Sequence, residues 1–224
     1  DEVKFPFSIF KKVKKSPDFS LSSFQLLMDI VERSLSGRTE EEQLIVLDYV
    51  IDSLKIDICS SAVISPLIQQ PSKPLAMPFP LEIFDENGNK VETSGGIIEI
   101  QLSETSVYVK PWNNSRTFSN ILYLSNKDFI YDSTNHYADY YADINLCYVY
   151  NGNHSINAGR YLKKGCIKTN VVNIEKLYQH CYSDGEYWYN THTKEKICEI
   201  DDFRLAAIFE IAKKRYFLKI KKGD

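Results

Sequence analysis

Ile144-Asn145-Leu146-Cys147-Tyr148-Val149-Tyr150, followed by Asn151-Gly152-Asn153-His154-Ser155, is the stretch of sequence that decides the fold. The first seven residues are mostly apolar or aromatic, which predicts a buried strand. The next five are turn formers, and residues 156–164 then predict a short helix that ends at Gly165. Residues 166–172 return to a strand pattern, so the element is strand, glycine turn, helix and strand.

The chain before this element contains two helical patterns and a stretch rich in proline. Apolar residues recur every three or four positions in 19–35 and 39–57, and Thr39 with Glu42 forms a capping box at the start of the second helix. Residues 71–80, PSKPLAMPFP, contain four prolines and predict an extended linker. We therefore expect a helical N-terminal segment with a basic arm at 1–70, a linker at 71–80 and a second domain at 81–224.

Strand patterns dominate beyond the linker. We expect strands at 81–84, 90–93, 97–102 and 106–109, and a further candidate strand at 129–132, with Asn87-Gly88 turning the first two into a hairpin. Short helices are expected at 118–124 and 174–181, a longer one at 203–216, a second hairpin from 186–189 and 196–200, and a polar, Tyr-rich loop at 133–143. The expected fold class is α+β, with an N-terminal helical segment followed by a mixed β-sheet domain.

Bulk composition excludes several classes of protein. The 27 basic and 30 acidic residues give a net charge of −3 and a pI near 5.9, which excludes a uniformly basic nucleic-acid coat. No apolar run approaches the ~20 residues of a membrane span, and the first residues do not resemble a signal peptide. The five cysteines are odd in number and widely spaced, which is typical of reduced thiols. We expect a cytoplasmic protein with no membrane partner.

The corner at 152–155 predicts an anion site. The first amides of a helix lack partners within the helix, and its dipole favours negative charge at that end. Gly152 permits a positive φ or the close approach of a ligand, and Asn153, His154 and Ser155 place polar side chains at the same corner. The alternative is an ordinary strand-to-helix turn that Ser155 or Asn153 caps.

This stretch resembles the core of the ParB/sulfiredoxin superfamily, in which a strand enters a Gly-x-His-Arg or Gly-x-Arg-Arg turn before a short helix. The resemblance covers residues 144–173, with Gly152 as the turn glycine and His154 as the motif histidine. It implies a bacterial or phage protein that binds a nucleotide or nucleic acid, with ATP or CTP and Mg²⁺ as cofactors. It also implies a nuclease or a phosphotransferase.

Ser155 stands where that superfamily usually has the arginine that clamps phosphate. Either Arg160 or Arg116 replaces it, or nucleotide binding has been lost. The alternative function is therefore a non-catalytic protein-interaction module, in which the acidic face of the N-terminal helices binds a protein partner. Residues 29–57 contain eight acidic residues against three basic ones.

Further residues are candidates for the same site. His136 is predicted to be a general base or a metal ligand that faces His154, with Asp132 as a weaker catalytic candidate; the alternative is a loop histidine exposed to solvent. Trp112 could stack on a base while Arg116 grips phosphate, or Trp112 could fill the core and Arg116 pair with a carboxylate.

Three other patterns favour a structural interpretation. His180, Cys181, His192 and Cys198 match no common zinc-finger spacing, so no metal site is assigned. Five tyrosines between 137 and 150 form either a base-stacking platform or ordinary strand positions, and we favour the second. The basic clusters at 11–15 and 213–222 form either a nucleic-acid patch or solvated ends.

Overall fold

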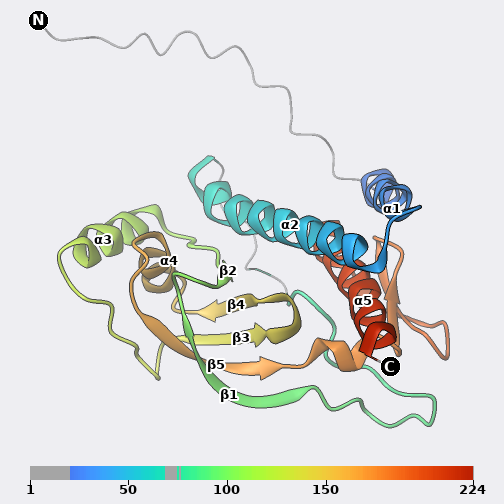
Figure 1. Cartoon of the computed structure of the whole chain (residues 1–224). Coiled ribbons are helices and arrows are strands. Elements are labelled where there is room, and N and C mark those ends of the chain that lie inside the picture. The colour runs from blue at the N-terminus through green and yellow to red at the C-terminus, as the bar shows by residue number, and fades with distance from the viewer. Residues whose placement is uncertain (1–20, 69–74, 76, 224) are drawn as a thin grey trace, which may run out of the picture.

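The computed structural model describes residues 21–68, 75 and 77–223 (Figure 1). The predicted basic cluster at 11–15 and most of the linker at 71–80 lie outside the described residues. Two helices open the described part, α1 (Leu21–Leu35) and α2 (Glu40–Ile68). The capping box at the start of α2 is confirmed, because the Glu42 amide donates to Thr39 Oγ1 and the Thr39 amide donates to Glu42 Oε2 at 2.9 Å.

Helix α2 is longer than the sequence pattern predicted. It continues eleven residues beyond Asp57, because its inward stripe continues through Ile58 and Ala62 as far as Pro66 in the last turn. No glycine or other helix-stop signal interrupts 58–65. None of the helices in the described residues combines the length and the apolar character needed to cross a bilayer.

A mixed five-stranded sheet lies beneath α2 (Figure 1). Its strand order is β1-β5-β3-β4-β2, in which β3 is parallel to β5, β2 is parallel to β4, and the other two pairs are antiparallel. The strands are β1 (Ser94–Gln101), β2 (Ser106–Tyr108), β3 (Tyr137–Tyr141), β4 (Leu146–Asn151) and β5 (Cys166–Val172). A separate antiparallel sheet contains β6 (Cys181–Ser183), β7 (Tyr187–Asn190) and β8 (Lys196–Glu199).

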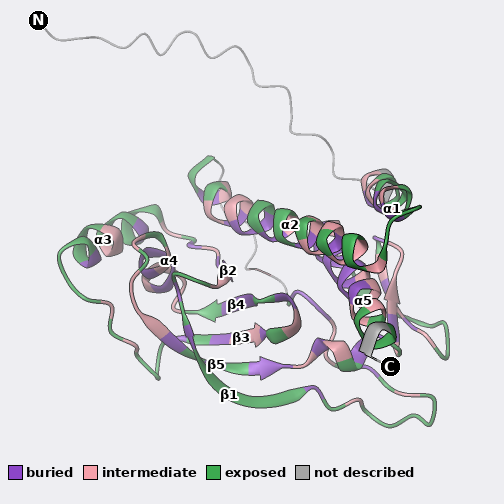
Figure 2. Ribbon diagram, viewed as in Figure 1, coloured by how far each residue is buried: buried purple, intermediate pink, exposed green. Residues whose placement is uncertain are grey.

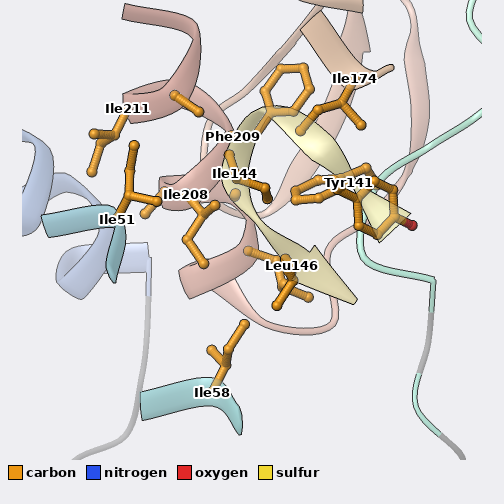
Figure 3. Packing of buried hydrophobic residues seen from close by; sticks show 14 of the residues in the cluster. Ile51, Ile58, Tyr141, Ile144, Leu146, Ile174, Ile208, Phe209 and Ile211 are labelled. Atoms are coloured by element: carbon orange, nitrogen blue, oxygen red, sulfur yellow. The ribbon is translucent and has the colours of Figure 1, made fainter. Parts of the chain in front are cut away.

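Alternation along β4 divides the core between the two faces of the large sheet. Leu146 and Tyr148 belong to the cluster formed with α1, α2 and α5 (Phe203–Gly223), whereas Cys147 and Val149 belong to a second cluster with Ile156 of α4 (Asn153–Tyr161). Figure 3 shows the first cluster and Figure 2 shows how burial follows these layers. The first cluster joins residues on both sides of the predicted 71–80 linker, and the division of the chain there stays a prediction.

The α+β class is confirmed, and several element predictions are corrected. Residues 133–143 are not a loop throughout, because β3 lies in the middle of the sheet with Ala138 and Tyr141 buried. Helix α3 (Asn114–Ser125) begins four residues before its predicted start, since the Asn113 side chain caps it by accepting from the Arg116 amide. No strand forms at 129–132. The predicted hairpin around Asn87-Gly88 is reduced to one bridge between Phe84 and Lys90.

The end of the chain also differs from the sequence pattern. The predicted helix at 174–181 is a short 3-10 helix, Ile174–Leu177, followed by β6. Helix α5 continues past residue 216 to Gly223. Helices α2 and α5 pack against each other on the same face of the large sheet (Figure 1). This pairing leaves α3 and α4 together at the other end of the molecule, where the glycine corner lies.

Candidate functional site

The corner between β4 and α4 requires a glycine for two reasons. Gly152 has φ +80°, in the left-handed region that strains other residues. A Cβ atom at this position would also lie 2.6 Å from His136 Cδ2 and 3.0 Å from the Asn135 carbonyl oxygen. The glycine therefore lets the corner close directly onto the 135–136 backbone.

The first amides of α4 are available to a ligand. The first hydrogen bond of the helix runs from the Ile156 amide to the Gly152 carbonyl oxygen, at 3.0 Å. The amides of Asn153, His154 and Ser155 have no acceptor among the described residues. All three residues line a pocket of about 350 Å³, together with residues of α3 and the loops beside it. Its full lining is Trp112, Arg116, Asn120, Asn135, Asn151, Gly152, Asn153, His154 and Ser155.

Helix α3 brings Arg116 and Trp112 to this pocket. The Arg116 guanidinium lies 5.3 Å from the centre of the Trp112 ring, and no ion pair joins it to a described carboxylate. The Trp112 ring meets the His154 ring edge-on at 5.1 Å and is 54% exposed. The predicted alternatives, a core tryptophan and an arginine paired with a carboxylate, do not describe these residues.

His154 is held by the loop before α3. The Asn113 amide donates to His154 Nε2 at 3.1 Å, so in the neutral ring Nδ1 carries the proton. Partial burial and the nearby positive charge of Arg116 lower the pKa of His154 below its usual value. The ring is therefore a neutral hydrogen-bond donor at pH 7, with its acceptor nitrogen already used.

His136 is buried beneath the pocket and does not line it. The Asp132 amide donates to His136 Nδ1 at 3.0 Å, which places the proton on Nε2. His136 Nε2 then donates to Ser155 Oγ at 2.8 Å, and Ser155 Oγ donates to the Gly152 carbonyl oxygen at 3.1 Å. Burial lowers the pKa of His136, outweighing the opposite effect of Asp132. This chain of hydrogen bonds orients the corner, and it uses both ring nitrogens.

Three other predicted residues have different surroundings. Asp132 caps its own turn by accepting from the Thr134 amide and hydroxyl, and it does not line the pocket. Arg160 lines a different cavity of about 440 Å³, between α2, α3 and α4, so Arg116 is the only one of the two predicted arginines at the corner. The Asn153 side chain accepts from the Lys110 amide at 3.0 Å, so it positions the corner while its own amide faces the pocket.

Sequence reasoning did not single out Asn120. It follows Arg116 by one helical turn, and its side chain donates to the Arg116 carbonyl oxygen. The spacing of four from Arg116 on one predicted helix was a usable signal, but the predicted helix began only at residue 118 and so excluded Arg116.

The basic residues of α5 are largely engaged within the chain. Arg215 is buried and pairs with Asp48 and Asp143. Lys214 pairs with Glu32, and Lys221 lies 3.3 Å from Glu40. These contacts with the acidic N-terminal helices favour intramolecular packing over a free nucleic-acid patch at this end.

Comparisons with known proteins show the family of the chain and nothing finer. No curated protein and no solved structure matches it. A family model described as "Family of unknown function (DUF6710)" matches residues 8–222, which include the whole of the glycine corner and all eight strands. The chain therefore belongs to the DUF6710 family.

Proposed function

We propose that the pocket at the glycine corner binds a phosphate-bearing ligand, a nucleotide or the end of a nucleic acid. The observation that carries this proposal is the meeting of three unpaired helix amides with one arginine in a single pocket. The described lining residues include no Asp or Glu, so no carboxylate would repel an anion there. The resemblance of residues 144–173 to the ParB/sulfiredoxin superfamily supports the same ligand class.

Each part of the pocket suits one part of such a ligand. The amides of Asn153, His154 and Ser155 would accept a phosphate as the N-terminus of a helix does. The Arg116 guanidinium would add charge-assisted hydrogen bonds in place of the missing arginine at 155. The exposed side of the Trp112 ring offers an apolar surface to a base. With ATP or CTP, Mg²⁺ would be held by the phosphates and water rather than by side chains of this pocket.

The geometry favours binding over proton transfer. A general base needs a free lone pair within reach of the substrate. The acceptor nitrogens of His136 and His154 are both occupied by backbone amides, from Asp132 and Asn113 respectively. Nuclease or phosphotransferase activity would therefore require either histidine to exchange its partner when the ligand binds.

Calorimetric titration of the purified chain with inorganic phosphate, ATP, CTP, GTP and a short DNA, with and without Mg²⁺, tests the proposal. Loss of charge-assisted hydrogen bonds predicts that Arg116→Ala weakens binding roughly 10- to 100-fold. Arg160→Ala is the matched control, because Arg160 lines the other cavity, and its affinity should equal that of the wild type. Absence of binding by every probe, or equal losses in both variants, would contradict a phosphate site at this corner.

A second candidate function, binding of a protein partner, is favoured by the outer face of α2. Ile45, Tyr49 and Ile56 share one stripe of this helix and are 65%, 72% and 67% exposed. Asp52 lies on the same stripe, which favours a partner surface that is apolar with basic residues beside it. Figure 2 shows this exposed side facing away from the sheet. Sedimentation analysis of the wild type and Tyr49→Asp would show whether a second copy of this chain is the partner.

A further inference from the structure

A cluster of two histidines and a glutamate lies on the small sheet, away from the glycine corner. His180 precedes β6, His192 lies in the turn between β7 and β8, and Glu86 lies in the turn after Phe84. His180 Nδ1 and His192 Nε2 are 2.8 Å apart, and Glu86 Oε2 lies 3.9 Å from the first and 3.7 Å from the second. These are three potential metal ligands in one small triangle.

The size of this triangle suits a transition metal. A circle through points separated by 2.8, 3.7 and 3.9 Å has a radius of about 2.1 Å. This radius matches the roughly 2.0–2.2 Å of zinc bonds to histidine nitrogen and carboxylate oxygen. One ion could therefore contact all three atoms with small side-chain movements.

The backbone segments that carry the three ligands are fastened to one another. Asn190 is buried, and its side chain donates to the Phe84 carbonyl oxygen and accepts from the His192 amide, both at 2.8 Å. The Thr191 amide donates to the His180 carbonyl oxygen at 2.9 Å. Asp85 closes the turn that bears Glu86 by accepting from the Asn87 and Asn89 amides. The ligands are thus positioned before any metal arrives, which lowers the entropic cost of binding.

The sequence pattern grouped the histidines with the wrong partners. Cys181 is buried and its thiol contacts the Tyr182 carbonyl oxygen, while Cys198 lies within β8 opposite Trp188. Neither cysteine belongs to the triangle. The third ligand, Glu86, is 94 residues before His180 in the chain, so no local spacing could have identified it.

We propose that Glu86, His180 and His192 bind one divalent transition-metal ion, with Zn²⁺ as the first candidate. Two imidazoles and one carboxylate form a borderline-soft ligand set that suits Zn²⁺ better than Mg²⁺ or Ca²⁺. The ion replaces the proton shared between the two imidazoles, and that proton leaves to solvent. A water molecule completes the coordination, because the cluster lies at the surface. The ion joins the turn at 85–89 to the small sheet.

The test is titration of the untagged, chelator-treated full chain with ZnCl₂, followed by calorimetry, and with CoCl₂, followed by visible absorption. One ion per chain is expected. His192→Gln and Glu86→Gln each remove one ligand at the surface and should weaken binding at least about tenfold. Glu195→Gln, in the same turn as His192, is the matched control and should bind like the wild type. Free Zn²⁺ at one hundred times the dissociation constant should raise the wild-type Tm by about 5–10 °C.

Several outcomes would overturn the proposal. One is the absence of a saturable Zn²⁺ site in the wild type, and another is equal affinity in the wild type and His192→Gln. Loss of binding in Cys198→Ser with binding retained in Glu86→Gln would place the ion elsewhere. Far-ultraviolet circular dichroism of each variant without metal separates loss of a ligand from loss of the fold, and Glu86, at an exposed turn, provides the variant least able to disturb folding.

Discussion

Two pairs of histidines in this chain illustrate opposite uses of the imidazole ring. At the glycine corner, His136 and His154 each accept a hydrogen bond from a backbone amide. On the small sheet, His180 and His192 point ring nitrogens at each other, with a carboxylate less than 4 Å away. The first pair is built into the backbone of a pocket, whereas the second offers lone pairs to something that is not protein. Proximity to a motif indicated the first pair, but the partners of the ring nitrogens distinguish the two roles.

Gly152→Ala should have the largest effect on the corner. The substitution combines a left-handed φ of +80° with a Cβ atom 2.6 Å from His136 Cδ2. Strain of about 1–2 kcal/mol and overpacking of about 1–3 kcal/mol together predict a loss of roughly 3 kcal/mol. Urea unfolding followed by circular dichroism measures this loss.

Gly88→Ala is the matched control for Gly152→Ala. Gly88 has nearly the same φ, +77°, but nothing lies within 4 Å of its added Cβ. It should lose only the conformational part, about 1 kcal/mol. Equal losses in the two variants would show that the corner does not press against His136, and the hydrogen-bonded account of that histidine would then fail.

His136→Phe should cost about 2 kcal/mol at pH 7, because the stacking on Phe129 is kept while the Asp132 amide and Ser155 hydroxyl lose their partner. The cost should also depend on pH. Burial depresses the folded-state pKa of His136, so the unfolded chain binds the proton more readily. The stabilisation is complete above the unfolded value of about 6.5 and is lost as the pH falls toward the folded value.

Unfolding free energies of the wild type and His136→Phe between pH 8 and pH 5 measure this dependence. The difference between the two proteins should shrink on acidification. Parallel curves would mean that His136 is not held neutral by its surroundings. Arg116→Ala is a useful reference variant, because Arg116 is exposed and the same experiment should leave the His136 contribution in place.

Local patterns predicted the corner well because its determinants are local. The strand β4, the turn at Gly152 and helix α4 follow from apolar alternation and from turn formers within a dozen residues. The same is true of the capping box at Thr39. Which side chains meet at the pocket was predicted only in part, since Arg116 and Trp112 reach it through the packing of α3 against α4.

Long-range pairing explains what the sequence pattern missed. Strand β3 was predicted as a loop because Asp139 and the tyrosines around it are polar, and only the pairing with β4 and β5 places Ala138 and Tyr141 inside. The Glu86 carboxylate meets the two histidines only because Asn190 ties its turn to the small sheet. Contacts of this kind depend on topology, which propensity and spacing do not encode.

Ser155→Ala should have a smaller effect than His136→Phe. The variant removes the acceptor of the His136 Nε2 proton but leaves the Asp132 amide paired. One buried donor without a partner predicts a loss of about 1 kcal/mol. A double-mutant cycle with His136→Phe measures the coupling, which should account for most of that loss. Fully additive changes would mean that the two side chains do not interact.

His192→Gln should have the smallest effect on stability when a chelator is present. The His192 side chain is 28% exposed, and the backbone amide that Asn190 holds is unchanged by the substitution. Only the hydrogen bond to His180 is lost, so the expected cost is within about 0.5 kcal/mol. The contrast with His136→Phe is the point of the measurement, because a histidine that serves a ligand is nearly dispensable to the folded chain without it. A loss as large as that of His136→Phe would make the His180–His192 pair a structural element and remove the difference between the two histidine pairs.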